Sequence, residues 1–174
     1  MKRLSADEAD AIFARATAPS LEAISSTLPL GWVSMTHHMR LSCAIRDELG
    51  TARNIELWKR AMVHSFERPF LRGFVSMTTN LLGLRPPSLL RRGGSIYSHV
   101  TRNAGAMHWD ERGDKKGEAV LTGFPADRYD FSCYLEGLAG CIDATLSICN
   151  THGSVRVVER DDARGDVRYH VEWA

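Results

Sequence analysis

The most suggestive polar residues in the sequence lie on two stretches that predict neighbouring strands. Residues 95–102 and 106–110 alternate with a period of two and flank a turn centred on Asn103 and Ala104. A two-residue turn sets the register, and that register places four side chains on one face of the strand pair: Tyr97, His99, His108 and Asp110. Imidazole, phenol and carboxylate groups can bind a polar ligand or transfer protons. A functional cluster and an ordinary solvated sheet surface both explain this pattern, and the sequence favours the second.

The sequence contains none of the familiar catalytic or metal-binding motifs. His37 and His38 are adjacent, so on a helix they point about 100° apart and cannot hold one ion as an i, i+4 pair does. The glycine-rich stretches 82–84 and 92–95 match neither the phosphate-binding loop nor the dinucleotide-binding pattern, and there is no G-x-S-x-G elbow. We therefore expect no metal and no catalysis of a recognisable class. An enzyme of unknown class stays open, with the tyrosine and the two histidines named above as its acid–base candidates.

The cysteines indicate a reduced protein. Three of them, Cys133, Cys141 and Cys149, are spaced eight residues apart on one predicted helix, and the fourth is Cys43. Eight helical residues span about 12 Å, which is too far for a disulfide. There is no C-x-x-C pair, and the basic start of the chain lacks the apolar stretch of a secretory signal. We expect buried, structural thiols and a cytoplasmic location.

Length, composition and charge predict one globular domain covering residues 1–174. Apolar residues make up 44% of the chain and charged residues 25%, which suffices for a buried core. The 22 basic and 21 acidic residues leave a formal charge of +1, so no broad field attracts nucleic acid or an anionic membrane. No apolar run approaches the roughly 18 residues of a membrane span. Of the 22 basic residues 18 are arginine, dispersed along the chain, which fits a protein partner better than nucleic acid.

The first half of the chain predicts helices. A Ser-x-x-Glu capping box at residues 5–8 begins a short helix, and helical stripes follow over residues 32–49 and 54–66. Beyond Pro69 a further helical segment continues the last stripe to about residue 81. The apolar side chains of this continued stripe would line a pocket between the helices and a sheet. They are Trp58, Met62, Phe66 and Phe74.

The second half of the chain predicts strands around one long helix. Five strands are expected, at residues 95–102, 106–110, 118–124, 155–157 and 167–173. Asp127 can cap the helix, which carries Gly137 and Gly140 at a cost of about 1 kcal/mol each. Close approach of this helix to the sheet, or to the same helix of a second subunit, would offset that cost. The result is an α+β domain, with N-terminal helices packed with a small antiparallel sheet of about five strands and one long helix between strands three and four.

These elements resemble a paralogous family of unknown function best known from myxobacteria. The similarity extends over residues 58–83 and 89–94, Gly117-Glu118 with Pro125, the helix around Gly137, and residues 167–173. More distantly, the order of elements is similar to the group of vinyl-reductase, haem–nitric oxide and TRAPP-like vesicle-tethering domains. This resemblance implies helices on a small antiparallel sheet, with dimerisation or a hydrophobic ligand. The haem-binding branch carries a Tyr-x-Ser-x-Arg motif that residues 95–102 do not match, so we expect no cofactor.

Three functions follow as hypotheses. The first is a non-enzymatic regulatory or scaffold module that associates with itself or with another protein. The second is a sensor domain that binds a hydrophobic small molecule between helices and sheet, and the third is an enzyme of unknown class. The residues expected to contact a ligand are Trp58, Met62, Phe66, Phe74, Tyr97, His99 and His108.

Overall fold

A computed structural model describes residues 4–27, 31–67, 85–127 and 129–174 of the chain. It confirms the α+β class, with an antiparallel sheet of four strands in the order β1-β2-β4-β3 and a long helix between β2 and β3. The helices are α1 (Ala6–Ala16), α2 (Ala18–Ser25), α3 (Met35–Leu49), α4 (Thr51–Glu67), α6 (Pro86–Leu90), α7 (Gly93–Val100) and α8 (Phe131–Ile148). The strands are β1 (Ala106–Gly113), β2 (Lys116–Thr122), β3 (Gly153–Asp161) and β4 (Asp166–Trp173). The segment predicted to be helical after Pro69, with Phe74, lies outside the described residues.

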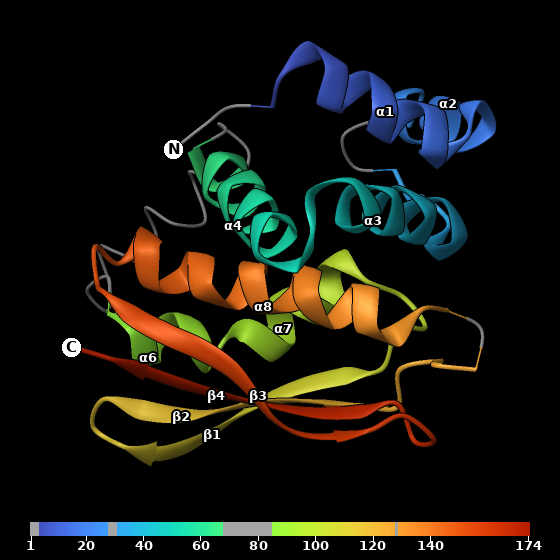
Figure 1. Ribbon diagram of the computed structural model, residues 1–174. Coiled ribbons are helices and arrows are strands. Elements are labelled where there is room, and N and C mark those ends of the chain that lie inside the picture. Colours follow the sequence, from blue (N-terminus) through green and yellow to red (C-terminus); the bar gives the residue numbers. More distant parts are fainter. Residues whose placement is uncertain (1–3, 28–30, 68–84, 128) are drawn as a thin grey trace.

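The elements form layers on one face of the sheet (Figure 1). Helix α8 lies over the sheet, with α6 and α7 beside it, and α3 and α4 lie over α8. Helices α1 and α2 form the outermost layer, packed on α3. We call the side of the sheet under α8 the helix-covered face and the opposite side the outer face. None of the helices in the described ranges combines the length and the hydropathy that a bilayer crossing requires.

The N-terminal helices follow the sequence signals closely. Ser5 and Glu8 form the predicted capping box, in which the Ser5 hydroxyl accepts from the Glu8 amide at 3.2 Å and Glu8 accepts from the Ser5 amide at 2.9 Å. Helix α3 ends at Gly50, whose φ of +76° suits a glycine. A small apolar cluster joins α1 to α3 and comprises Ile12, Ala16, Ala44 and Ile45.

The predicted strand at residues 95–102 is wrong, because this stretch is helix α7. Ile96 and Val100 are spaced as well for a helical turn as for a strand, and tertiary contacts decide between the two. Helix α7 packs against β1 so closely that a Cβ on Gly94 would lie 2.2 Å from the carbonyl oxygen of Met107. Tyr97 points into the core and is 6% exposed. The Gly93-Gly94 pair thus opens a helix and does not end one.

Helix α8 begins three residues later than predicted and meets a different neighbour. Asp130, and not Asp127, is the N-cap, since its carboxylate accepts from the Cys133 amide at 2.9 Å. The helix glycines serve contact with α4, and not with the sheet or with a second subunit. A Cβ on Gly140 would lie 2.2 Å from the carbonyl oxygen of Ile55, and one on Gly137 would touch the Trp58 ring at 3.4 Å.

The closing hairpin has the predicted alternation. On β4 the side chains of Val167, Tyr169 and Val171 are 0–1% exposed and face α8, so the strand predicted at residues 167–173 is confirmed, with one buried face. The residues between them, Arg168 and His170, point to the outer face, where they meet the polar side chains of the neighbouring strands. The main core therefore fills the space between the sheet and α8.

Candidate functional site

The polar cluster predicted on the sheet is not assembled. His108 pairs across the sheet with Val120 and not with His99, because His99 lies on α7. The His99 ring is exposed, and its Nδ1 lies 2.6 Å from the carbonyl oxygen of Ser95 one turn earlier. Tyr97 is buried in the core. The three acid–base candidates therefore do not converge.

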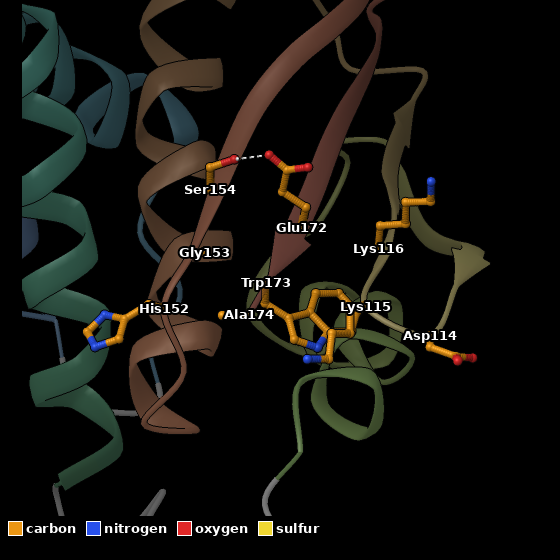
Figure 2. Close-up of a pocket in the computed structure, with 9 residues that line it drawn as sticks. All are labelled: Asp114, Lys115, Lys116, His152, Gly153, Ser154, Glu172, Trp173 and Ala174. Carbon is orange, nitrogen blue, oxygen red and sulfur yellow. Dashed lines mark hydrogen bonds between the residues drawn. The ribbon is translucent and has the colours of Figure 1, made fainter.

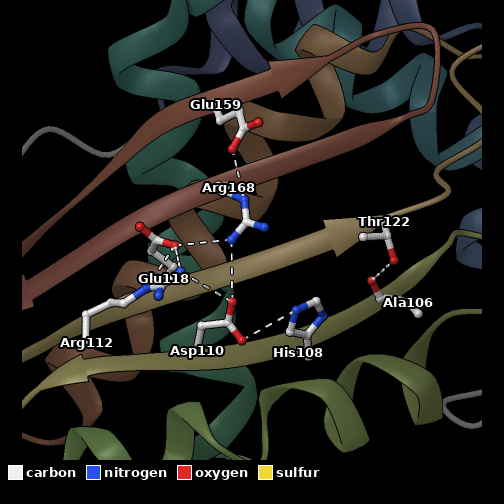
Figure 3. Close-up of polar contacts among 8 residues, drawn as sticks. All are labelled: Ala106, His108, Asp110, Arg112, Glu118, Thr122, Glu159 and Arg168. Atoms are coloured by element: carbon white, nitrogen blue, oxygen red, sulfur yellow. Dashed lines mark hydrogen bonds and ion pairs between the residues drawn. The ribbon is translucent and has the colours of Figure 1, made fainter.

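His108 and Asp110 do share the outer face, as part of an ion-pair network (Figure 3). Arg168 is its centre: Nη1 lies 3.2 Å from a Glu118 oxygen and 3.4 Å from an Asp110 oxygen, and Nε lies 2.9 Å from a Glu159 oxygen. Neighbouring guanidinium groups lower the pKa of Glu118, chiefly through its hydrogen bond from Arg112. The His108 side chain is 53% exposed. Exposed pairs of this kind contribute little energy and are screened by salt, so the outer face is a solvated charged surface.

A groove lies on the helix-covered side, between the start of α3 and the end of α7. Its volume is about 680 Å³, within the range of roughly 300–1,000 Å³ that holds small ligands. Three separate segments line it: residues 31–38, residues 100–103 and the two tyrosines around the start of α8. The lining residues are Gly31, Trp32, Val33, Ser34, Met35, His38, Val100, Thr101, Arg102, Asn103, Tyr129 and Tyr134.

His38 is the imidazole of this groove. Its ring lies against Trp58, with 5.1 Å between ring centroids and an interplanar angle of 51°. Burial lowers the pKa of His38, because the charged imidazolium loses its hydration there. The groove is thus lined by a neutral imidazole, which can accept a hydrogen bond or a metal through an unprotonated nitrogen.

One buried phenol, Tyr134, lines the groove, and a second, Tyr97, lies behind it. The Tyr97 hydroxyl lies 2.6 Å from the carbonyl oxygen of Ala104 and 2.7 Å from the Tyr134 hydroxyl. Because the Tyr97 proton goes to the carbonyl, Tyr134 must donate to Tyr97. Burial raises the pKa of both tyrosines, so the pair is neutral. Tyr97, one of the predicted ligand residues, therefore supports the groove from behind Tyr134.

Arg102 is the charged residue at the rim. Its guanidinium carbon lies 4.0 Å from the centroid of the Trp32 ring, a cation–π contact that holds both side chains over the opening. Trp32 is 48% exposed and Val100 is 61% exposed. A lining that mixes aromatic and apolar side chains with one cation suits a hydrophobic molecule that carries a negative group.

The other predicted pocket residues are placed differently. Trp58 lies behind His38 and packs on α8 at Gly137. Its indole nitrogen is buried and has no hydrogen-bond partner among the described residues. Met62 and Phe66 are half-buried on α4 and do not line the groove. Phe74 lies outside the described residues. The pocket predicted from Trp58, Met62, Phe66 and Phe74 stays a prediction, because the segment that carries Phe74 lies outside the described residues.

A second hollow of about 600 Å³ lies at the end of the sheet (Figure 2). Residues 114–116, 152–154 and 172–174 line it, and the Ser154 hydroxyl donates to Glu172 at 3.1 Å. Figure 2 shows His152 and Asp114 at opposite ends of this hollow, so its charged groups do not converge on one point. We regard it as a weaker candidate than the groove.

Sequence reasoning missed most residues of the groove. Trp32, His38, Arg102, Tyr129 and Tyr134 come from three distant segments and share no spacing that a periodicity analysis could detect. The sequence singles out His38 only as the neighbour of His37. The two in fact diverge: His37 Nδ1 lies 3.1 Å from the Ser20 hydroxyl of α2, whereas His38 lines the groove.

Comparison with known proteins gives a clear result for the fold. No family model matches the sequence, and no curated protein matches it either. Among solved structures, the Fe(II) unliganded H-NOX protein from K. algicida aligns over 97% of this chain and 87% of its own, with a TM-score of 0.63 and 11% identity. An oxygen-binding H-NOX domain related to soluble guanylate cyclases aligns over 84% and 75%, with a TM-score of 0.55 and 16% identity.

A third structure, from work on haem distortion in the H-NOX family, aligns over 89% of this chain and 82% of its own, with a TM-score of 0.58 and 14% identity. At these identities the similarity shows a shared fold. The distant resemblance to the haem–nitric oxide group is thus confirmed as a fold relationship. The resemblance to the myxobacterial family finds no support in these comparisons.

Proposed function

We propose that this domain is a sensor that binds a planar, hydrophobic small molecule in the groove between α3 and α7. The observation that carries the proposal is the groove itself, with neutral His38 and Tyr134 inside and Arg102 at the rim. This function is the second of the three hypotheses drawn from the sequence. The groove is lined by both α3 and the end of α7, so a bound molecule would contact two layers of the fold at once.

Haem is the first ligand to test, because the similar solved structures are named for haem or for Fe(II). The described residues fit it in two respects. His38 offers a neutral imidazole, the commonest protein ligand of haem iron, and Arg102 offers a cation for a propionate. When bound, haem supplies an iron that can take a diatomic gas. The role of His38 is then to hold the group, while Trp58 fixes the plane of the imidazole.

Titration of the purified protein tests the proposal with two probes, haemin and the planar anionic dye 1-anilinonaphthalene-8-sulfonate. We expect saturable binding of at least one probe, quenching of tryptophan fluorescence from Trp32, and at least a tenfold loss of affinity in His38→Ala. The matched control is His99→Ala, which removes an exposed histidine outside the groove and should leave binding unchanged. Absence of saturable binding of both probes would overturn the sensor function. Dye binding without a haemin absorbance band would leave an apolar ligand other than haem.

The scaffold function is the second candidate, and one feature favours it. Strand β3 is an edge of the sheet, and its Val157 and Val158 are 44% and 50% exposed. Exposed apolar edges promote pairing with a second copy. The bulge between Val157 and Glu159 works against such pairing, which places this function after the sensor. Light scattering of the wild type and of Val158→Lys tests it, and a monomer across micromolar concentrations would remove it.

A further inference from the structure

Two cysteines from distant parts of the sequence meet where α3 crosses the start of α8. Cys43 lies on α3 and is half-buried, whereas Cys133 lies in the first turn of α8 and has no exposed surface. Cys43 packs against the core cluster that contains Cys133, and each of the two thiols is the largest influence on the pKa of the other. Helical spacing in the sequence relates only Cys133, Cys141 and Cys149 to one another. The proximity of Cys43 to Cys133 arises from the tertiary structure.

The crossing point is fixed from both sides. Arg46, almost one turn after Cys43 on α3, donates to the Asp130 carboxylate at 3.0 Å. The other oxygen of Asp130 accepts from the backbone amide of Cys133 at 2.9 Å. The Arg46–Asp130 ion pair and the Asp130 N-cap therefore fix α3 against the first turn of α8, where the two cysteines lie.

The two thiols differ in pKa: that of Cys43 is lowered and that of Cys133 is raised. Oxidation by a peroxide requires one thiol that ionises readily. The hydrogen bond from Cys133 lowers the pKa of Cys43, and the Arg46 charge adds to this, while burial and the carboxylates of Asp47 and Asp130 oppose it. The same contact, together with burial, raises the pKa of Cys133. Cys43 is thus the thiol that ionises first and the one that solvent can reach.

Cys141 on α8 and Cys149 at its C-cap are half-buried like Cys43, but burial alone shifts the pKa of their thiols. It raises the pKa of Cys141 to about 12 and that of Cys149 to about 11. They serve as internal controls on the same helix.

We propose that Cys43 and Cys133 form a peroxide-oxidisable site that closes a disulfide between α3 and α8. The Cys43 thiolate attacks one oxygen of a hydroperoxide, so that an S–O bond forms, the O–O bond breaks and the second oxygen leaves as water or an alcohol. The Cys133 sulfur then attacks the Cys43 sulfenic acid, an S–S bond forms, and the hydroxyl leaves as water with the thiol proton. Two thiols are oxidised and one peroxide is reduced.

Peptide mapping of the full-length protein after treatment with hydrogen peroxide tests this site. We expect the intact mass to fall by two hydrogen atoms, two of the four thiols to resist maleimide labelling after denaturation, and one linked peptide pair that joins Cys43 to Cys133. A dithiol reductant should reverse all three changes. Four free thiols after treatment, or a linkage of other cysteines, would overturn the proposal.

Variants assign the roles of the two sulfurs. Cys133→Ser should accumulate a sulfenic acid on Cys43 that dimedone traps, and Cys43→Ser should retain three free thiols after the same treatment. Cys149→Ser is the matched control and should still form the bond. Loss of the bond in this control, or dimedone labelling of Cys141, would contradict the assignment. The mapping of the wild type decides the question even if a variant does not fold.

Discussion

The two faces of the sheet place similar side chains in opposite environments. In β4, Tyr169 has no exposed surface and donates to the carbonyl oxygen of Leu135 at 3.1 Å, while its neighbour Arg168 is partly exposed and forms ion pairs with three carboxylates. Among the histidines, His38 is half-buried in the groove on the helix-covered side and His108 is largely exposed on the outer face. Residue types alone would nominate the outer face as the site. A polar group binds a ligand selectively where water is excluded from it. On this sheet, water is excluded on the helix-covered face.

The largest expected effect is at Tyr169. Tyr169→Ala should lower the free energy of unfolding by about 4 kcal/mol, because it leaves a cavity in the core and an unpaired carbonyl. Tyr169→Phe removes the hydrogen bond alone and should cost about 1 kcal/mol. Urea unfolding monitored by circular dichroism measures both. A small effect of Tyr169→Ala would mean that the helix-covered face does not provide most of the stability.

The next effect tests how closely α8 meets α4. Gly140→Ala should destabilise the protein by about 2 kcal/mol, since its Cβ would lie 2.2 Å from a backbone oxygen that cannot move alone. Gly93→Ala, at a site with nothing within 4 Å, is the control and should change stability by less than about 1 kcal/mol. Equal behaviour of the two variants would refute the close contact between the helices.

A smaller effect concerns pH and His38. Its pKa in the folded protein lies below the ordinary value of 6.5, so the native state binds fewer protons than the unfolded state as the pH falls through 6.5. Stability should therefore decrease on acidification below about pH 6.5, by less than about 1.4 kcal/mol per pH unit. His38→Gln should flatten this part of the profile in urea unfolding measured from pH 8 to pH 5. An unchanged slope in the variant would show that the imidazole is not desolvated.

The smallest expected change in stability is that of a substitution on the outer face. Arg168→Ala should shift the urea midpoint less than Tyr169→Phe does, and the remaining shift should vanish in about 1 M salt, where charges are screened within about 3 Å. Glu118 is part of the same network, and its lowered pKa predicts a small stabilisation above its ordinary pKa that is lost as the pH falls through the lowered value. A large effect of Arg168→Ala that persisted in salt would give the outer face a structural role.

Local signals in the sequence predicted the first helix and the end of α3, whereas α3, α4 and α8 each begin three residues away from the predicted start. The capping box at Ser5, the end of α3 at Gly50 and the alternation of β4 depend on neighbouring residues, and each is found as expected. The stretch around Tyr97 was misread because its apolar spacing suits two secondary structures. Only the backbone contact between Gly94 and β1 selects the helix.

By itself the sequence determined the class of the fold, because patterns of period 3.6 and period 2 report which side of each element is buried. The tertiary structure alone decided where chemistry is possible. The groove joins residues 31–38 to Arg102 and Tyr134, and the thiol pair joins Cys43 to Cys133, across separations that no local pattern encodes. Both sites depend on which groups lose contact with water, and that depends on how the layers of helices pack on one another and on the sheet.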